Sequence, residues 1–187
     1  MSEKVLQLLG NIAAAELSLD EIKLLVATIL KGIPQGRYGQ ELVYELRRLV
    51  PSISFEGVLI RNSSTGGREV FMRRRKANET YPGQWHCPGS TLEAKEDEAA
   101  IAKRVGETRF GFDLRPGQYS LAGHYWSPVE PSSIGGTYLA LVYLLDQHLV
   151  PTLPGEWHPV EQLPEDTIVT HRGIIDIAIN LHYRQLP

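Results

Sequence analysis

The segment from residue 81 to residue 112 constrains the fold of this chain most, because it prescribes a loop of defined shape followed by a helix. Its first part, YPGQWHCPGS, is rich in proline and glycine, which favour tight turns. An acidic stretch follows, and apolar residues then recur at helical spacing up to Gly111, a residue type that commonly ends helices. A loop leading into a charged helix is a common design for a functional site, so we expect the function here.

This loop and helix resemble the signature of the Nudix hydrolase superfamily, whose box reads G-x5-E-x7-R-E-U-x-E-E-x-G-U, where U is a bulky apolar residue. With the box glutamate on Glu96, the box arginine falls on Arg104, and the final glycine and apolar residue fall on Gly111 and Phe112. In the family this glutamate and arginine tie the loop to the helix, and we take both as candidate catalytic residues. The preceding GQWHCPG resembles the G-x-W-x-x-P-G turn of many Nudix proteins, which predicts that Trp85 is a buried anchor.

The box positions that hold a divalent cation in the family carry no carboxylate in this chain. They fall on Val105, Thr108 and Arg109, which supply an apolar group, a hydroxyl and a guanidinium. In the family, glutamates on one helix face bind Mg²⁺ or Mn²⁺ through oxygen, and the ion helps to generate the attacking hydroxide. We therefore expect a protein that recognises a nucleoside diphosphate-linked small molecule, with weak or no metal-dependent pyrophosphate hydrolysis.

Other carboxylates offer a second interpretation, in which hydrolysis survives at a shifted metal site. Glu93, Glu96 and Glu107 would bind Mg²⁺ or Mn²⁺, and Glu107 would also take part in catalysis. Glu130, in a later loop, would supply a catalytic base. The competing interpretation is that the loop acids stabilise the helix N-terminus and that Glu107 pairs with Lys103 on a solvated face.

Arginines close to the box are candidates for contact with phosphate. Arg73, Arg74 and Arg75 stand at the end of a predicted strand, and planar guanidinium groups bind phosphate oxygens bidentately. The alternative is a solvated strand end that discourages edge pairing, and both interpretations stay open. Arg109, at the vacated metal position, is expected to touch a bound phosphate directly.

The rest of the chain predicts an α/β protein. β-Branched and apolar runs indicate strands at 53–61, 69–75, 118–126 and 137–146. An amphipathic helix at 171–183 closes the chain, and residues 156–164 resemble the E-W-x-P-x-x-x-L-P segment of many Nudix proteins. This order fits the Nudix-like α/β/α sandwich with a mixed sheet. Trp126 and Tyr138 are candidates to line a base or sugar pocket, because aromatic rings stack on nucleobases.

A small helical segment at residues 1–50 is predicted to precede the Nudix-like domain of residues 51–187. Ser18 and Glu21 form a capping-box pattern at the start of one helix. The charges of this segment balance, whereas a DNA-reading helix should present a basic face, so we favour packing or dimerisation. The most continuously apolar helix suggests a homodimer through Leu24, Leu25, Ile29 and Leu30.

Composition narrows the class of protein further. The chain has 187 residues, of which 42% are hydrophobic and 22% charged, as in soluble globular proteins. Its net charge of −3 argues against general binding of DNA or membrane surfaces. Cys87 is the only cysteine, which excludes an intramolecular disulfide, and no apolar run approaches the roughly 20 residues of a membrane span. We expect a cytoplasmic protein whose partner is a nucleotide-like small molecule.

Overall fold

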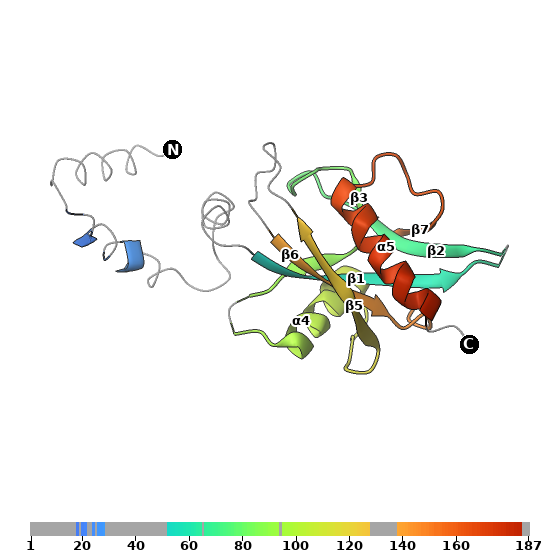
Figure 1. Cartoon of the computed structure of the whole chain (residues 1–187), viewed down its shortest axis with the longest axis horizontal. Helices are drawn as coiled ribbons and strands as arrows, with labels where there is room; N and C mark the ends of the chain where they lie inside the picture. The colour runs from blue at the N-terminus through green and yellow to red at the C-terminus, as the bar shows by residue number, and fades with distance from the viewer. Residues whose placement is uncertain are drawn as a thin grey trace. The chain divides into compact units, whose positions relative to one another are not determined.

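The chain divides into two compact units, Met1–Gln40 and Glu41–Pro187. Figure 1 shows the computed structural model. It describes residues 18, 20–21, 24, 26–28, 52–64, 66–93, 95–127 and 138–184.

The first unit contains the predicted capping box. The backbone N–H and the hydroxyl of Ser18 donate to a carboxylate oxygen of Glu21 at 2.8 and 2.7 Å. The backbone N–H of Glu21 donates in return to the Ser18 hydroxyl at 3.4 Å. The predicted cap is therefore confirmed. Most of the residues named for a homodimer lie outside the described residues, namely Leu25, Ile29 and Leu30, so that contact stays a prediction.

The second unit is built on a mixed sheet to which the described residues contribute seven strands. These are β1 (Ser52–Asn62), β2 (Arg68–Arg74), β3 (Trp85–His86), β4 (Gly89–Thr91), β5 (Tyr119–Ser127), β6 (Tyr138–Leu145) and β7 (Glu156–Pro159). The main path runs β3-β2-β1-β6-β5, while β4 pairs with β1 and β7 pairs with β2. Only the β1–β6 pair is parallel among the described strands. The four longer strands match their predicted ranges closely.

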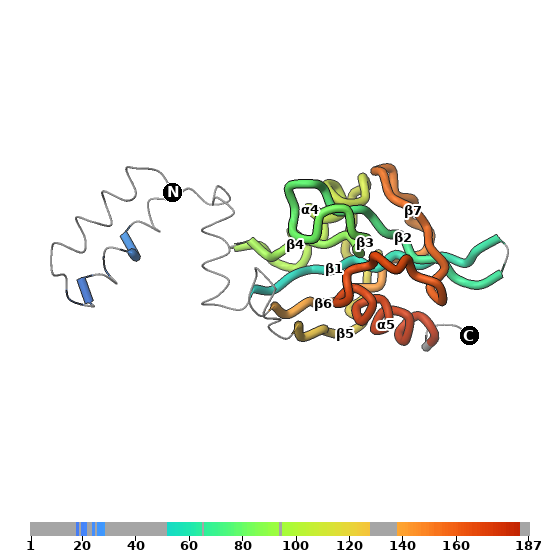
Figure 2. The backbone as a smooth tube through the Cα atoms, turned by 90° about the horizontal axis from the view of Figure 1, so that it is seen from above, coloured from blue at the N-terminus to red at the C-terminus, as the bar shows by residue number. Residues whose placement is uncertain are grey.

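Helices cover the two faces of this sheet. Helix α4 (Glu98–Val105) begins at Asp97, whose carboxylate caps it by accepting from the backbone N–H of Ala100. Helix α5 (Val169–Arg184) closes the described chain. Figure 2 shows α4 and α5 on opposite sides of β1, which is the predicted α/β/α sandwich. No helix among the described residues is long and apolar enough to cross a membrane.

Two apolar cores lie on the two faces of the sheet, and β1 contributes to both. Val58 and Ile60 belong to the core beneath α5, whereas Phe55 and Leu59 belong to the core beneath α4. Alternation along the strand explains this division, because successive side chains point to opposite faces. A strand covered on both sides should be apolar throughout. Glu56 breaks that pattern in the middle of the buried run.

The end of the box helix differs from the sequence prediction. The predicted regular helix stops at Val105, and a π-helical turn, η1 (Gly106–Phe110), follows it. The N–H of Gly111 donates to the carbonyl of Gly106 at 2.8 Å, and Gly111 ends the segment with φ of 86° as its position predicted. The helical spacing predicted up to Gly111 therefore holds only as far as Val105, because the π turn changes the angle between successive side chains beyond it.

Candidate functional site

Glu96 and Arg104 form the predicted tie between the box loop and α4. Arg104 donates from Nε and Nη2 to the two carboxylate oxygens of Glu96 at 2.6 and 2.7 Å. It also donates to the Ser90 hydroxyl and to the carbonyl of Thr91, at 2.8 and 2.9 Å. The hydrogen bond from Arg104 lowers the pKa of Glu96. These contacts hold the loop in place against α4. The catalytic role of the two side chains stays a prediction.

The family's metal positions do not suit a divalent cation in this chain. Val105 is fully buried in the core beneath α4. The hydroxyl of Thr108 donates to the carbonyl of Arg104 at 2.6 Å, and Arg109 carries a positive charge. None of the three side chains supplies an anionic oxygen, the ligand that Mg²⁺ and Mn²⁺ favour in proteins. The residues present here therefore do not fit either ion.

The shifted carboxylate set is not brought together either. Both carboxylate oxygens of Glu96 accept hydrogen bonds from Arg104. Nη1 of Arg104 also lies 3.6 Å from a carboxylate oxygen of Glu93. Glu107 is exposed and faces Lys103 at 3.9 Å, as the competing interpretation proposed. Among the described residues, no three His, Cys, Asp or Glu side chains are grouped so that they could hold a metal ion. Glu130, the candidate base, lies outside the described residues.

The candidate arginines divide into two kinds by their partners. Arg73 donates to the carbonyls of Pro154 and Arg109 at 2.8 and 2.9 Å, so it joins two backbone segments. Arg74 pairs with Asp166 at 2.8 Å and lies over the ring of Trp85, 4.5 Å from its centroid. Both side chains are engaged in holding the fold together.

Arg75 and Arg109 keep hydrogen-bonding capacity. The Nε atom of each is buried and has no hydrogen-bond partner among the described residues. Both side chains are half-buried, and Nη1 of Arg109 lies 3.5 Å from a carboxylate oxygen of Glu79. Buried donors are normally satisfied, so unpaired ones at a partly open position are typical of a binding site. We call Glu56, Arg75, Glu79, His86 and Arg109 the arginine site.

Glu56 lies at the base of the arginine site with only 8% of its surface exposed. Burial raises the pKa of Glu56 to about 7, and the nearby Ser54 hydroxyl and the charges of Arg75 and Arg109 oppose that rise. Its carboxylate rests against Gly89, the partner of Glu56 on β4, where any Cβ would overlap it. Glycine is therefore required at this point of the box loop.

His86 and Glu79, the other members of the arginine site with shifted pKa values, each have one charge state at neutral pH. Burial, and then Arg75, lower the pKa of His86 to about 3, so this ring is neutral. Burial would raise the pKa of Glu79, but the backbone N–H of Lys76 and the charges of Arg75 and Arg109 outweigh it, so the pKa of Glu79 is lowered. Arg75 and Arg109 are thus accompanied by the ionised carboxylate of Glu79 and by Glu56. When Glu56 is protonated, the arginine site carries a net positive charge.

The two candidate aromatic residues are separated by the sheet. Tyr138 lies close to the arginine site, since Glu56 and Arg75 are among the groups that shift its pKa, which burial raises to about 12. Trp126 is 56% exposed and pairs with Leu139, the neighbour of Tyr138 on β6. Because successive residues of a strand face opposite ways, the register places Trp126 and Tyr138 on opposite faces. They cannot enclose the same base from the same side.

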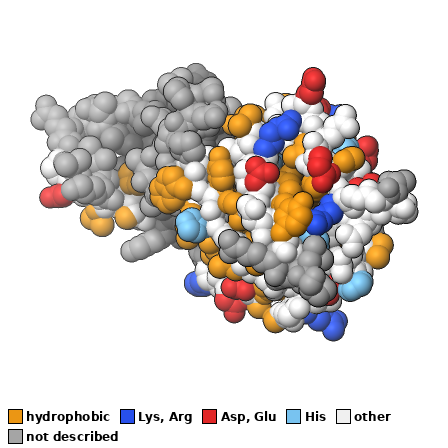
Figure 3. Space-filling model, turned by 45° about the vertical axis from the view of Figure 1, so that its right-hand side comes forward, with side chains coloured by type: hydrophobic (Ala, Val, Ile, Leu, Met, Phe, Trp, Pro, Cys, Tyr) orange, Lys and Arg blue, Asp and Glu red, His pale blue; other side chains and the backbone are white. Residues whose placement is uncertain are grey.

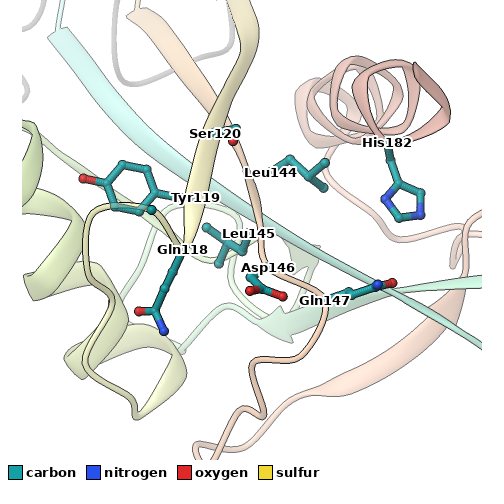
Figure 4. A pocket seen from close by; sticks show the side chains of 9 residues that line it. Gln118, Tyr119, Ser120, Leu144, Leu145, Asp146, Gln147 and His182 are labelled. Atoms are coloured by element: carbon teal, nitrogen blue, oxygen red, sulfur yellow. The ribbon is translucent and has the colours of Figure 1, made fainter. Parts of the chain in front are cut away.

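A separate polar hollow of about 260 Å³ lies beside the start of β5 and the end of β6 (Figure 4). It shares no residue with the arginine site and is lined by Gly117, Gln118, Tyr119, Ser120, Leu144, Leu145, Asp146, Gln147 and His182. No lysine or arginine is among these residues, and Asp146 adds a negative charge. A phosphate group would therefore be poorly matched here.

On the face shown in Figure 3, lysine and arginine side chains lie singly among acidic and apolar ones. The described residues form no broad basic surface on that face. A protein that binds long nucleic acids needs such a surface to neutralise the phosphate backbone. The compact arginine site is suited instead to a small anion.

The sandwich, the tied loop and the glycine-ended helical segment together define a Nudix fold. No family model and no curated protein sequence matches the chain. The chain does match solved structures. A MutT Nudix hydrolase from Burkholderia pseudomallei is similar to it with a TM-score of 0.55 and 19% sequence identity, over 68% of this chain and 97% of that one.

Two structures from Shewanella oneidensis are also similar. NrtR matches with a TM-score of 0.54 and 16% identity over 71% of this chain, which spans 63% of that protein's length. The Nudix domain of NrtR complexed with ADP ribose matches with a TM-score of 0.53 and 15% identity, over 83% of this chain and 97% of that domain. At these identities the likeness establishes the fold.

Sequence reasoning missed Glu56 and Glu79 as parts of the site. Glu56 did leave a signal, since it is the one acid within the apolar run ISFEGVLI. A lone charge in a strand that is buried on both faces needs a partner or a function. Glu79 lies in a polar turn between the basic run and the box loop, where nothing in the sequence separates it from an ordinary surface acid.

Proposed function

We propose that this protein recognises a small molecule containing a nucleoside diphosphate, and that Arg75 and Arg109 contact its phosphates in place of a metal ion. The observation that carries the proposal is the position of Arg109. It stands where the Nudix box has a metal-binding glutamate, half-buried and with an Nε–H that no other described residue accepts. The complex of the similar NrtR Nudix domain with ADP ribose supports this class of ligand.

The chemistry of the arginine site favours binding over turnover. Guanidinium groups match phosphate oxygens in charge and in geometry, and partial burial strengthens their attraction. The contact between Arg109 and Glu79 is long, at 3.5 Å, so a phosphate oxygen can displace that carboxylate. Hydrolysis needs an activated water, and the family's metal positions hold no carboxylate that could help to generate one.

Calorimetric titration with ADP-ribose in excess EDTA tests this proposal. We expect wild-type protein to bind without metal, and Arg109→Ala and Arg75→Ala each to weaken binding at least tenfold, on the order of 1.4 kcal/mol or more. Arg115→Ala is the matched control, because Arg115 is exposed and its guanidinium pairs with Asp113, two residues earlier in the chain. Unchanged thermal unfolding of the site variants would show that they still fold.

A hydrolase using the shifted set would behave differently. It would bind or cleave ADP-ribose only with Mg²⁺ or Mn²⁺, and Glu96→Gln and Glu107→Gln would abolish product release. Metal-dependent turnover together with an Arg109→Ala variant of undiminished affinity would overturn the binding proposal.

A further inference from the structure

Glu56 is the one ionisable side chain among the seven consecutive buried residues of β1. It is held from both sides of the strand, since its backbone is in register with Gly89 on β4 and with Val142 on β6. Its carboxylate cannot withdraw toward Gly89, because the box loop is already in contact with it there. The carboxyl group is therefore held in place at the centre of the sheet, where its charge interacts with those of Arg75 and Arg109.

The titratable groups whose charges interact with Glu56 come from several elements. Arg75 follows β2, Arg109 belongs to η1, Cys87 lies between β3 and β4, and Tyr138 begins β6. Ser54 lies on β1 itself, two residues before Glu56, and its buried hydroxyl has no hydrogen-bond partner among the described residues. Only the two arginines among these groups carry a charge at neutral pH. An ionised Glu56 is thus an internal counter-ion for the same guanidinium groups that a diphosphate would use.

Resting on the function proposed above, we propose that Glu56 takes up a proton when the diphosphate binds, so that its carboxylate is a protonation-controlled competitor for Arg75 and Arg109. A bound dianion repels an ionised carboxylate in a partly buried site and favours its neutral form. Binding and protonation of Glu56 must then promote each other, because linkage between two sites is reciprocal.

The sign of the pH dependence follows from this linkage. The pKa of Glu56 in the free protein is about 7, and a bound diphosphate raises it. Below pH 7 the carboxyl is neutral both before and after binding, so affinity is constant. Above pH 7 binding must bring in a proton, and affinity falls by up to about tenfold per pH unit until the pKa of the bound state is reached.

Other groups near the site do not titrate between pH 6 and pH 8.5. The pKa of His86 is about 3, and burial, then His86 and Arg75, lower that of His171 well below its ordinary range. Burial raises the pKa of Cys87 well above 9.0, and that of Tyr138 is raised to about 12. A diphosphate diester such as ADP-ribose also loses no proton in this range. Glu56 is therefore the group that would account for proton uptake.

Calorimetry with ADP-ribose in EDTA tests the inference, at pH 6.0, 7.0 and 8.0 and in two buffers that differ in ionisation enthalpy. For the wild type we expect almost no proton uptake at pH 6.0, uptake approaching one proton at pH 8.0, and about tenfold weaker binding at pH 8.0 than at pH 6.0. Glu56→Gln should bind at pH 8.0 as tightly as the wild type at pH 6.0, with no buffer dependence. Asp113→Asn, which changes an exposed carboxylate, should keep the wild-type slope.

The outcomes separate this inference from the proposed function. Wild-type binding that is constant from pH 6.0 to pH 8.0 and takes up no proton would overturn the role of Glu56 and leave phosphate recognition standing. Absence of binding at every pH would overturn both. If Glu56→Gln fails to fold, the proton count measured on the wild type decides the question by itself.

Discussion

Arg104 and Arg109 lie on the same helical segment but differ in their partners. Arg104 uses all three of its guanidinium nitrogens on Glu96, Ser90 and Thr91. Arg109 has one long contact with Glu79 and a buried Nε–H with no partner among the described residues. At the scale of single residues, the first arginine is therefore committed to holding the loop, whereas the second keeps a donor that is unpaired among the described residues.

The Arg104 tie should contribute measurably to stability. We expect Arg104→Met to lower the free energy of unfolding by about 1–3 kcal/mol, because it leaves the largely buried Glu96 carboxylate without its bidentate partner. Lys103→Met is the control one residue away, where an exposed pair at 3.9 Å should contribute less than about 0.5 kcal/mol. Urea unfolding of both variants measures the difference, and equal losses would contradict a special role for the tie.

At the scale of elements, the π turn determines where Arg109 lies. The segment η1 ends at Gly111, whose positive φ lets the chain leave the helix at once. The backbone N–H groups of Thr152 and Leu153 both donate to the carbonyl of Phe110, and the Thr152 hydroxyl donates to that of Gly111 at 2.8 Å. These contacts fasten the end of the turn to the segment that precedes β7, which fixes the backbone of Arg109.

Two glycines with similar backbone angles allow a matched test of this ending. Gly111 and Gly117 have φ of 86° and 90°, so alanine at either position is strained by about 1 kcal/mol. A Cβ at Gly111 would also overlap the Thr152 hydroxyl, whereas nothing lies within 4 Å of one at Gly117. We expect Gly111→Ala to cost about 1–3 kcal/mol more than Gly117→Ala in thermal or urea unfolding. Similar costs would mean that the contact with Thr152 relaxes easily.

At the scale of the whole molecule, buried ionisable groups give the fold a pH dependence with two opposing parts. The folded-state pKa values of His86 and His171 are lowered, so the stability linked to them is present above about pH 6.5 and is lost as the pH falls. The folded-state pKa of Glu56 is raised, so its contribution is present below its ordinary value of 4.5 and is lost as the pH rises through about 7.

The variant Glu56→Gln should isolate the contribution of this carboxyl group to the pH dependence of stability. The contribution of His86 and His171 is the same in the variant and in the wild type, so it cancels in the comparison. At pH 8 we expect the variant to be more stable by up to roughly 3 kcal/mol, the free energy of a shift from 4.5 to about 7. The two proteins should converge as the pH falls toward 4.5. Urea unfolding across this range measures the difference, and a gap that does not change with pH would show that Glu56 keeps one charge state throughout.

Local patterns in the sequence determined much of this protein. Alternation and apolar runs predicted the long strands, and the box spacing predicted the pairing of Glu96 with Arg104 and the ending at Gly111. The turn motif predicted a buried Trp85, which is 5% exposed. Each of these features depends on residues close together in the chain, where periodicity and turn chemistry act directly.

Only the tertiary structure decided the site. Strands β3, β4 and β7 have two to four residues each, too short to show a period, and the π turn departs from the regular helix that the pattern indicated. Glu56, Arg75 and Arg109 come from three separate segments, and the pairing of strands and the packing of the box helix bring them together. No spacing in the sequence predicts that these three residues come together. Their proximity depends on how distant strands and helices pack, and the sequence does not show which arginines are already paired with other groups.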